Sequence, residues 1–130
     1  AYIIGEPSER LKKLHETIVR ANRTMVAGIK PGLKFCELFE IGMNVVKAVY
    51  PTYMRGHLGH SISFGPNTEE APFISPKETR EIKENMVLCV EVPFYIVGLG
   101  GINIEDMLIV KKDGVEELTK MSRDIRLPLR

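Results

Sequence analysis

The chain has 130 residues, the usual length of one domain, and its 44% hydrophobic and 27% charged residues are typical of a globular protein. Eighteen Lys and Arg against 17 Asp and Glu leave a net charge of +1, which excludes a nucleic-acid or membrane-surface binder that relies on a basic excess. No apolar run reaches the roughly 18 residues of a transmembrane helix. We therefore expect neither a nucleic-acid partner nor a membrane partner. The cysteines Cys36 and Cys89 lie in apolar segments, and we expect free, buried thiols in a reducing compartment, hence a cytoplasmic protein.

Two amphipathic helices are predicted in the first half of the chain. Ser8 is the expected N-cap of the first helix, and Gly28 ends its pattern of apolar residues at three- and four-residue spacing. The second pattern runs from Phe35 to Val49 and ends before Pro51. We interpret both apolar faces as core packing. The apolar positions of the first helix are Leu11, Leu14, Ile18, Ala21 and Met25.

The second half of the chain predicts strands and turns. Residues 66–76 contain three prolines and an acidic pair, and we expect a loop there. Two apolar runs are joined by a glycine-rich stretch near Leu99, which predicts a β-hairpin. The fold class expected is α+β, with two helices packed on an antiparallel sheet. The predicted strands are residues 60–64, 86–95, 102–111 and 115–119.

Two glutamates, Glu91 and Glu105, stand inside the apolar strands of the hairpin. Burying a carboxylate is costly unless it is paired, protonated or bound to a metal. If the hairpin turns near Leu99 with an even register, the two glutamates are near-diagonal neighbours on one face, and they repel unless a cation lies between them. A register change of one residue separates them. Alternation also allows each glutamate to be solvated on an exposed face, in which case the chain is an α+β domain without a metal site.

Two histidines, His57 and His60, precede the first predicted strand. The neighbouring Gly56 and Gly59 argue against a helix, and residues three apart on a strand face opposite ways. We expect one histidine to join the carboxylates and the other to lie aside, near substrate. One imidazole with carboxylates suits Mn²⁺, Co²⁺, Fe²⁺ or Zn²⁺. The two cysteines lack the C-x-x-C spacing of a structural zinc site.

Three ordered segments resemble the pita-bread metallohydrolases, the family of methionine aminopeptidase, Xaa-Pro aminopeptidase, proline dipeptidase and creatinase. Residues 59–63 (GHSIS) look like the family's G-H-G-I-G, residues 86–93 (MVLCVEVP) like its G-M-V-F-T-I-E-P, and residues 101–106 (GINIED) like its G-x-R-I-E-D. The resemblance covers essentially the whole chain and implies the C-terminal half of a pita-bread fold. The family's two aspartate ligands are expected immediately upstream of Tyr2. Residues 1–130 are therefore expected to be a single partial domain without that N-terminal part.

The resemblance also implies a site for two divalent metal ions. Mn or Co is the expected metal, and Zn or Fe is the alternative. It assigns His60 to one metal, Glu91 to a metal and to the proton of the attacking water, and Glu105 to both metals. His57 is a further catalytic candidate, and His57 and Glu69 are expected to contact substrate. Glu69 stands where the family has a second conserved histidine, in its H-E-x-P motif.

The function implied by the resemblance is hydrolysis of Xaa-Pro peptides, as in a proline dipeptidase, with a small peptide or peptide-like substrate. Because Glu69 replaces the second histidine, a creatinase-like amide or amidine hydrolase is the alternative, and a non-catalytic pita-bread binding module is a third. With two of five ligands missing, the 130 residues alone are expected to be inactive and to bind metal weakly. We expect an exposed sheet face to drive homo-oligomerisation or pairing with the missing N-terminal half.

Overall fold

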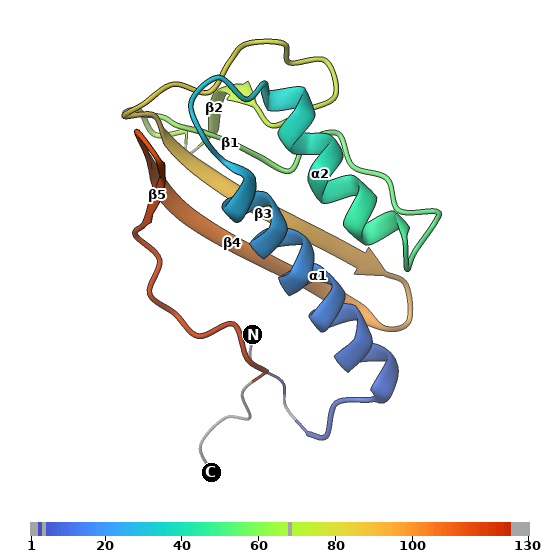
Figure 1. Ribbon diagram of the computed structural model, residues 1–130. Coiled ribbons are helices and arrows are strands. Elements are labelled where there is room, and N and C mark those ends of the chain that lie inside the picture. The colour runs from blue at the N-terminus through green and yellow to red at the C-terminus, as the bar shows by residue number, and fades with distance from the viewer. Residues whose placement is uncertain (1–2, 4, 68, 126–130) are drawn as a thin grey trace.

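A computed structural model describes residues 3, 5–67 and 69–125, and this part of the chain forms two helices packed on one face of a five-stranded antiparallel sheet (Figure 1). The order of strands in the sheet is β2-β1-β3-β4-β5, so the long β3–β4 hairpin contributes its central strands. The predicted α+β fold is confirmed. The elements are α1 (Glu9–Gly28), α2 (Phe35–Lys47), β1 (Gly59–Ile62), β2 (Glu69–Phe73), β3 (Val87–Ile96), β4 (Gly100–Lys111) and β5 (Gly114–Glu117).

The helices form where the apolar spacing predicts them. The Ser8 hydroxyl accepts a hydrogen bond from the backbone N–H of Leu11 at 3.2 Å, so the predicted N-cap is confirmed. Helix α2 ends at Lys47, two residues before the predicted Val49, because the chain turns there: the backbone N–H of Val49 bonds the carbonyl of Val46 at 3.0 Å. Four predicted positions of the first helix are completely buried: Leu14, Ile18, Ala21 and Met25.

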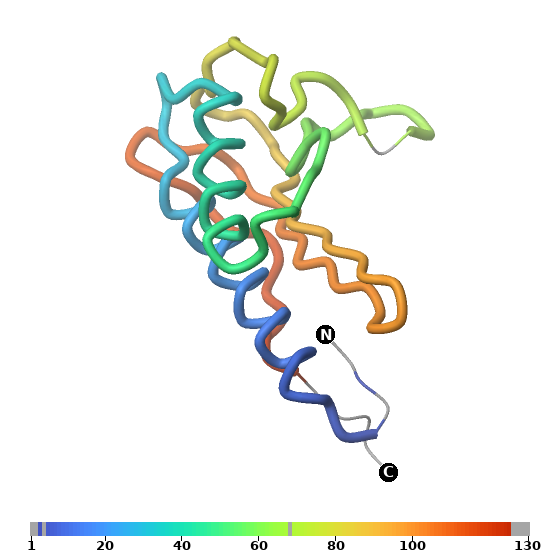
Figure 2. Tube along the Cα trace, turned by 90° about the vertical axis from the view of Figure 1, so that its right-hand side faces the viewer, coloured from blue at the N-terminus to red at the C-terminus, as the bar shows by residue number. Residues whose placement is uncertain are grey.

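Alternation along β3 and β4 divides their side chains between two faces of the sheet. Leu88, Val90 and Val92 face the helices and are completely buried. Figure 2 shows both helices stacked on this one side of the sheet. The opposite side, which we call the groove face, carries the remaining alternate residues. Around the middle of the β3–β4 hairpin, its polar and sulfur-containing members are His60, Cys89, Glu91, Asn103, Glu105 and Met107.

The hairpin register differs from the predicted one by two residues. Ile96 pairs with Gly100, so the turn is centred on Gly98 and not on Leu99. As a consequence Glu91 lies directly opposite Glu105, and the prediction of near-diagonal neighbours is wrong. Directly opposite side chains on one face of an antiparallel pair are closer than diagonal ones. The two carboxylates are therefore brought nearer to each other than the sequence predicted.

The predicted loop at residues 66–76 contains a strand, β2, and that part of the prediction is wrong. Strand β2 lies at the edge of the sheet and pairs with β1 alone. An edge strand tolerates Pro72, which lies at the irregularity between the pairs His60–Phe73 and Ser61–Glu70. The predicted strands 60–64 and 115–119 are observed two residues shorter at their C-terminal ends, as β1 and β5.

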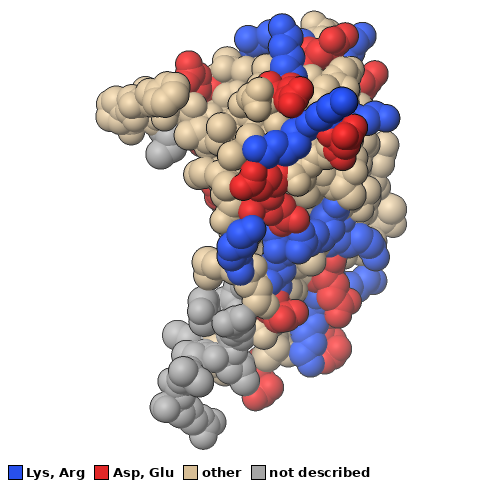
Figure 3. Space-filling model, turned by 60° about the vertical axis from the view of Figure 1, so that its left-hand side comes forward, with Lys and Arg blue, Asp and Glu red and all other residues tan. Residues whose placement is uncertain are grey.

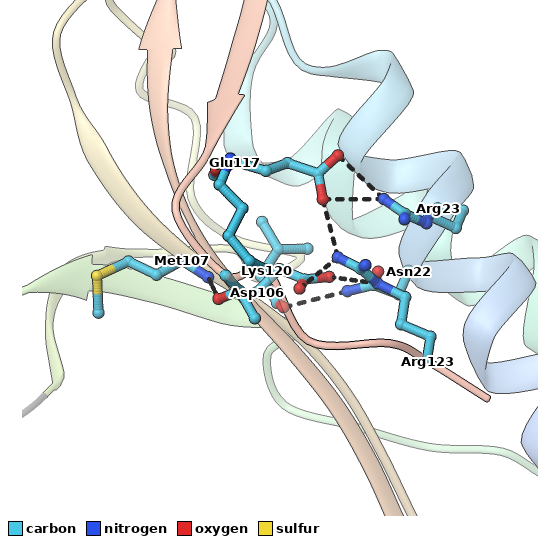
Figure 4. A network of polar contacts seen from close by, with 9 residues as sticks. Asn22, Arg23, Asp106, Met107, Glu117, Lys120 and Arg123 are labelled. Atoms are coloured by element: carbon cyan, nitrogen blue, oxygen red, sulfur yellow. Dashed lines mark hydrogen bonds and ion pairs between the residues drawn. The ribbon is translucent and has the colours of Figure 1, made fainter. Parts of the chain in front are cut away.

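A charged network fixes the chain that follows β5 to the helix-facing side of the sheet (Figure 4). Asp106, which is 1% exposed, accepts a hydrogen bond from Nε of Arg123 at 3.1 Å. Nη2 of Arg123 also contacts Oε2 of Glu117 at 2.8 Å, and that carboxylate pairs with Arg23 of α1 at 2.9 Å. Because Asp106 follows Glu105 on β4, this buried anchor also holds the backbone that presents Glu105 on the groove face.

Charged side chains of both signs lie on the face of the molecule seen in Figure 3. On the face shown in Figure 3, Lys and Arg side chains form a band across the middle, and Asp and Glu side chains lie above and below it. None of the helices in the described part of the chain has the length and apolarity that a membrane crossing requires.

Candidate metal centre

His60 is presented by β1 with one nitrogen already fixed. Its Nδ1 lies 2.9 Å from the carbonyl oxygen of Ser61. Because a carbonyl can only accept a hydrogen bond, Nδ1 carries the proton and Nε2 keeps a free lone pair. The side chain is 5% exposed, and within the described residues Nε2 makes no hydrogen bond. A buried imidazole with one nitrogen held by a carbonyl and the other free is prepared to bind a metal ion.

A glycine immediately before His60 lets β1 approach β3 closely. Gly59 has a φ of +139°, and a Cβ there would overlap the carbonyl oxygen of Cys89. Cys89 is the residue paired with His60 across the two strands. The glycine of the G-H motif therefore sets the distance between the histidine and the strand that carries Glu91.

The two glutamates share one amide. Nδ2 of Asn103 donates to Oε2 of Glu91 at 3.1 Å and to Oε2 of Glu105 at 3.3 Å. The amide supplies hydrogen bonds but no charge, so the like charges of the two carboxylates are not neutralised by it. A cation bound between them would supply that neutralisation. The sequence predictions did not include Asn103, although its position two residues before Glu105 places it on the same face of β4.

Cys89 is a member of this cluster that the sequence predictions treated only as a buried thiol. It is free and buried, as expected. Its Sγ donates a hydrogen bond to Oε1 of Glu105 at 2.9 Å. Burial, and then the hydrogen bond to Glu105, raise the pKa of the thiol well above its ordinary value, so Cys89 is protonated here. Cys89 stands two residues before Glu91 on the same strand, and this spacing indicates that the two side chains share one face of the sheet.

The ligand atoms of three of these residues converge. One atom each of His60, Cys89 and Glu105 lies within 4.8 Å of the other two. An imidazole, a thiol and a carboxylate on adjacent strands fit a transition-metal ion. Glu91 lies beside this group, opposite Glu105. Among the described residues, His60, Cys89 and Glu105 therefore fit a metal ion, and Glu91 lies beside them.

His57 lies beside the cluster as well. Its Nδ1 is 3.6 Å from Oε1 of Glu91, too long for a hydrogen bond. This nitrogen is buried without a hydrogen-bond partner among the described residues. Its ring centroid is 6.5 Å from that of His60 and 5.5 Å from that of Phe73. One histidine was expected to join the carboxylates, and His60 does so. The other histidine, His57, was expected to lie apart from them, but it lies next to Glu91.

A groove opens over the cluster, with a volume of about 630 Å³. The chain between β1 and β2 forms one wall, and Glu69 stands at the start of β2 on that wall. Thr119, after β5, lies on another side. The groove is large enough for a small peptide. Its walls are Ile62, Ser63, Gly65, Asn67, Glu69, Met107 and Thr119, around His60, Cys89, Glu91 and Glu105.

The fold and the donor set together define an α+β domain whose residues fit a metal ion. Residues 1–112 match the metallopeptidase family M24. The match covers most of the chain, and the chain belongs to this family. The resemblance found in the sequence is confirmed, including the expected similarity to the C-terminal half of the pita-bread fold.

Similar proteins carry peptidase names. A curated relative, the Xaa-Pro dipeptidase of Pyrococcus horikoshii, is 32% identical over 124 residues, which are 95% of this chain and 35% of that protein. The structure of an Xaa-Pro dipeptidase from Bacillus anthracis aligns with a TM-score of 0.89 and 31% identity, over 97% of this chain and 35% of that one. The structure of an X-Pro aminopeptidase from Thermotoga maritima aligns with a TM-score of 0.87 and 31% identity, over 95% of this chain and 35% of that one. The chain thus spans about a third of the length of the relatives it matches.

Proposed function

We propose that the 130 residues are the C-terminal, metal-binding part of a peptidase that hydrolyses Xaa-Pro peptides, as a proline dipeptidase does. The observation that carries this proposal is that His60 and Glu105 converge, with Glu91 opposite Glu105, under one groove in a chain of family M24. The names of the relatives support the substrate class. In this proposal, two aspartates that complete the ligand set are supplied by sequence upstream of the 130 residues.

Each residue of the cluster has a distinct part in the proposed reaction. Divalent metal ions, when bound, acidify the attacking water and stabilise the negative charge that develops on the peptide carbonyl oxygen. His60 and Glu105 are the ligands that this chain contributes most directly. Glu91 accepts the proton of the attacking water and returns it to the departing imino nitrogen as the peptide C–N bond breaks. Asn103 holds both carboxylates in place through its amide.

Two residues at the edge of the cluster are proposed to contact substrate. His57, next to Glu91, has a buried Nδ1 that is free to bond a substrate group. Glu69 stands on the groove wall and offers a carboxylate to a substrate amine. Because the family has a histidine at the position of Glu69, this carboxylate is also the observation that favours the second candidate function, hydrolysis of small amides or amidines of the creatine type.

The remaining expectations about the whole protein are proposals of the same kind. We propose Mn²⁺ or Co²⁺ as the working ions, with Zn²⁺ or Fe²⁺ as alternatives, since imidazole and carboxylate donors suit all four. We propose a cytoplasmic protein whose groove face meets either a second copy or the N-terminal half of the fold. Val87 and Met107, both partly exposed on this face, supply apolar surface for such a contact.

The direct test uses the whole protein that carries these 130 residues, with Mn²⁺ added. We expect it to hydrolyse alanylproline and to spare dialanine, creatine and N-acetylalanine. Cleavage of creatine or of the acylated amino acid in place of alanylproline would support the second candidate function. Failure to hydrolyse any of the four would contradict both.

A pair of glutamate variants on the groove face links activity to the cluster. We expect Glu91→Gln to lower kcat by ~10²–10⁴-fold, the range for loss of a general acid–base group. The matched control is Glu116→Gln on β5, where the exposed carboxylate pairs with Lys111 at 2.9 Å, outside the residues that line the groove. Equal activity of the two variants would remove Glu91 from the proposed mechanism.

A further inference from the structure

We propose that Cys89 is a ligand of the metal ion bound by His60 and Glu105, so that this centre has one sulfur donor among its nitrogen and oxygen donors. The inference rests on the proposed function only in taking the same cluster as a metal site. Thiolate is a soft donor, and its presence favours Zn²⁺ or Co²⁺ over Mn²⁺.

The placement of Cys89 is set by the pairing of three strands. It lies opposite His60 across β1 and β3, and its Sγ reaches Glu105 on β4 at 2.9 Å. Metal–ligand bonds of ~2.0–2.1 Å for imidazole, ~2.0–2.2 Å for carboxylate and ~2.3 Å for thiolate allow one ion to reach atoms separated in this way. The three atoms lie within 4.8 Å of one another. The sulfur of Cys89 is therefore as well placed as the donor atoms of His60 and Glu105.

The hydrogen bond between Cys89 and Glu105 brings the sulfur and a carboxylate oxygen into direct contact. The thiol hydrogen occupies the space between Sγ and Oε1. A ring nitrogen of His60 belongs to the same group of converging atoms. When a divalent ion binds, the S–H bond breaks, the proton leaves to water in the groove, and the sulfur lone pair forms the bond to the metal. The divalent charge then offsets the negative charges of the sulfur and of Glu105.

The chain contains a second cysteine that serves as an internal control. Cys36 lies in the first turn of α2, at partial exposure, and it is outside the group of converging donors. The two thiols differ in burial and in their position relative to the metal cluster, and only Cys89 belongs to that cluster. A sulfur contribution to metal binding must follow Cys89 and must not follow Cys36.

Cobalt reports sulfur ligation directly, because a thiolate bound to Co²⁺ gives a sulfur-to-metal charge-transfer band in the near ultraviolet. We expect this band when the whole protein is titrated with Co²⁺ alone. It should persist in Cys36→Ser and disappear in Cys89→Ser, while the weaker visible bands of bound Co²⁺ remain. Absence of the band in the unmodified protein, or its persistence in Cys89→Ser, overturns the proposal.

A second measurement needs no variant and so does not depend on the folding of Cys89→Ser. X-ray absorption of the zinc-loaded protein should show one sulfur scatterer at ~2.3 Å beside the shorter nitrogen and oxygen shell. A shell of nitrogen and oxygen alone overturns the proposal. In competition titrations, Cys89→Ser should lower the affinity for Zn²⁺ relative to Mn²⁺ by ~10–100-fold, and an unchanged ratio contradicts the sulfur ligand.

These results separate the sulfur ligand from the proposed peptidase. Cobalt that binds without a charge-transfer band, in a protein that hydrolyses alanylproline, removes Cys89 from the centre and leaves the peptidase proposal intact. A band that follows Cys89, in a protein that hydrolyses no Xaa-Pro peptide, establishes the ligand and contradicts the proposed substrate.

Discussion

Replacement of Gly59 by alanine tests whether close approach of β1 to β3 builds the site. Gly59 has a φ of +139°, a conformation that side-chain-bearing residues rarely adopt. A Cβ there would overlap the carbonyl oxygen of Cys89 and lie 2.8 Å from Cδ1 of Ile74. The backbone oxygen belongs to a central strand and cannot rotate away. Gly59→Ala must therefore push β1, and His60 with it, away from β3.

The expected cost follows from the contacts that such a shift disturbs. The unfavourable φ contributes about 1–2 kcal/mol. Two backbone hydrogen bonds at this place are weakened: Ile74 N–H to the Gly59 carbonyl at 2.8 Å and Glu91 N–H to the Leu58 carbonyl at 3.1 Å. At about 1 kcal/mol each, the loss of unfolding free energy sums to about 3–4 kcal/mol. For a domain of this size, Tm should fall by roughly 10–15 °C.

Thermal unfolding followed by far-ultraviolet circular dichroism measures this effect. Gly56→Ala is the matched control, because a Cβ at Gly56 meets nothing within 4 Å and its φ lies outside the left-handed region. That variant should stay within about 0.5 kcal/mol of the unmodified protein. If Gly59→Ala and Gly56→Ala unfold at the same temperature, β1 does not approach β3 as closely as the structure shows. The argument for the position of His60 then fails.

Three further perturbations address the supports of the site and the helix-facing side. Asn103→Ala removes the amide that bonds both glutamates and should weaken Mn²⁺ binding by ~10–100-fold in calorimetric titration; unchanged affinity would show that the amide has no part in holding the ligands. Asp106→Asn breaks the buried pair with Arg123 and should cost about 3 kcal/mol in urea unfolding, whereas Asp113→Asn in the exposed turn should cost almost nothing. Burial lowers the pKa of His15 below its ordinary value of 6.5. As the pH falls below 6.5, the unfolded state therefore binds more protons than the folded state, and the free energy of unfolding declines. His15→Leu should reduce this decline between pH 7 and pH 5, and an equal decline in both proteins would contradict the role given to His15.

The sequence predicts the elements whose pattern is local. The spacing of Leu14 and Ile18 identifies α1, and the alternating apolar runs identify β3 and β4. Strand β2 escapes prediction because it is an edge strand. Its acidic residues and Pro72 are tolerated where half of the backbone hydrogen-bonding groups face away from the sheet. Such a strand forms because β1 is there to pair with it, which is a tertiary cause that local composition does not carry.

The sequence predicts which face of the hairpin carries the site, but it does not predict the register of the two strands. Motif resemblance and alternation both place Glu91 and Glu105 on one face, but the centre of the turn at Gly98 decides that they lie directly opposite. The same register brings Cys89 to Glu105. A shift of two residues keeps each side chain on its face but changes its neighbours. The contacts of Cys89 and Asn103 therefore emerge only from the three-dimensional structure.

The central claim, that the groove face holds a divalent metal ion through His60 and Glu105, is tested most directly by calorimetric titration of the whole protein with Mn²⁺. We predict that Glu105→Gln lowers the affinity at least ~100-fold, because it removes a charged ligand, while Glu116→Gln on the same face of the sheet leaves it unchanged. If Glu105→Gln binds Mn²⁺ as tightly as Glu116→Gln does, the metal is not held by this cluster and the account is wrong.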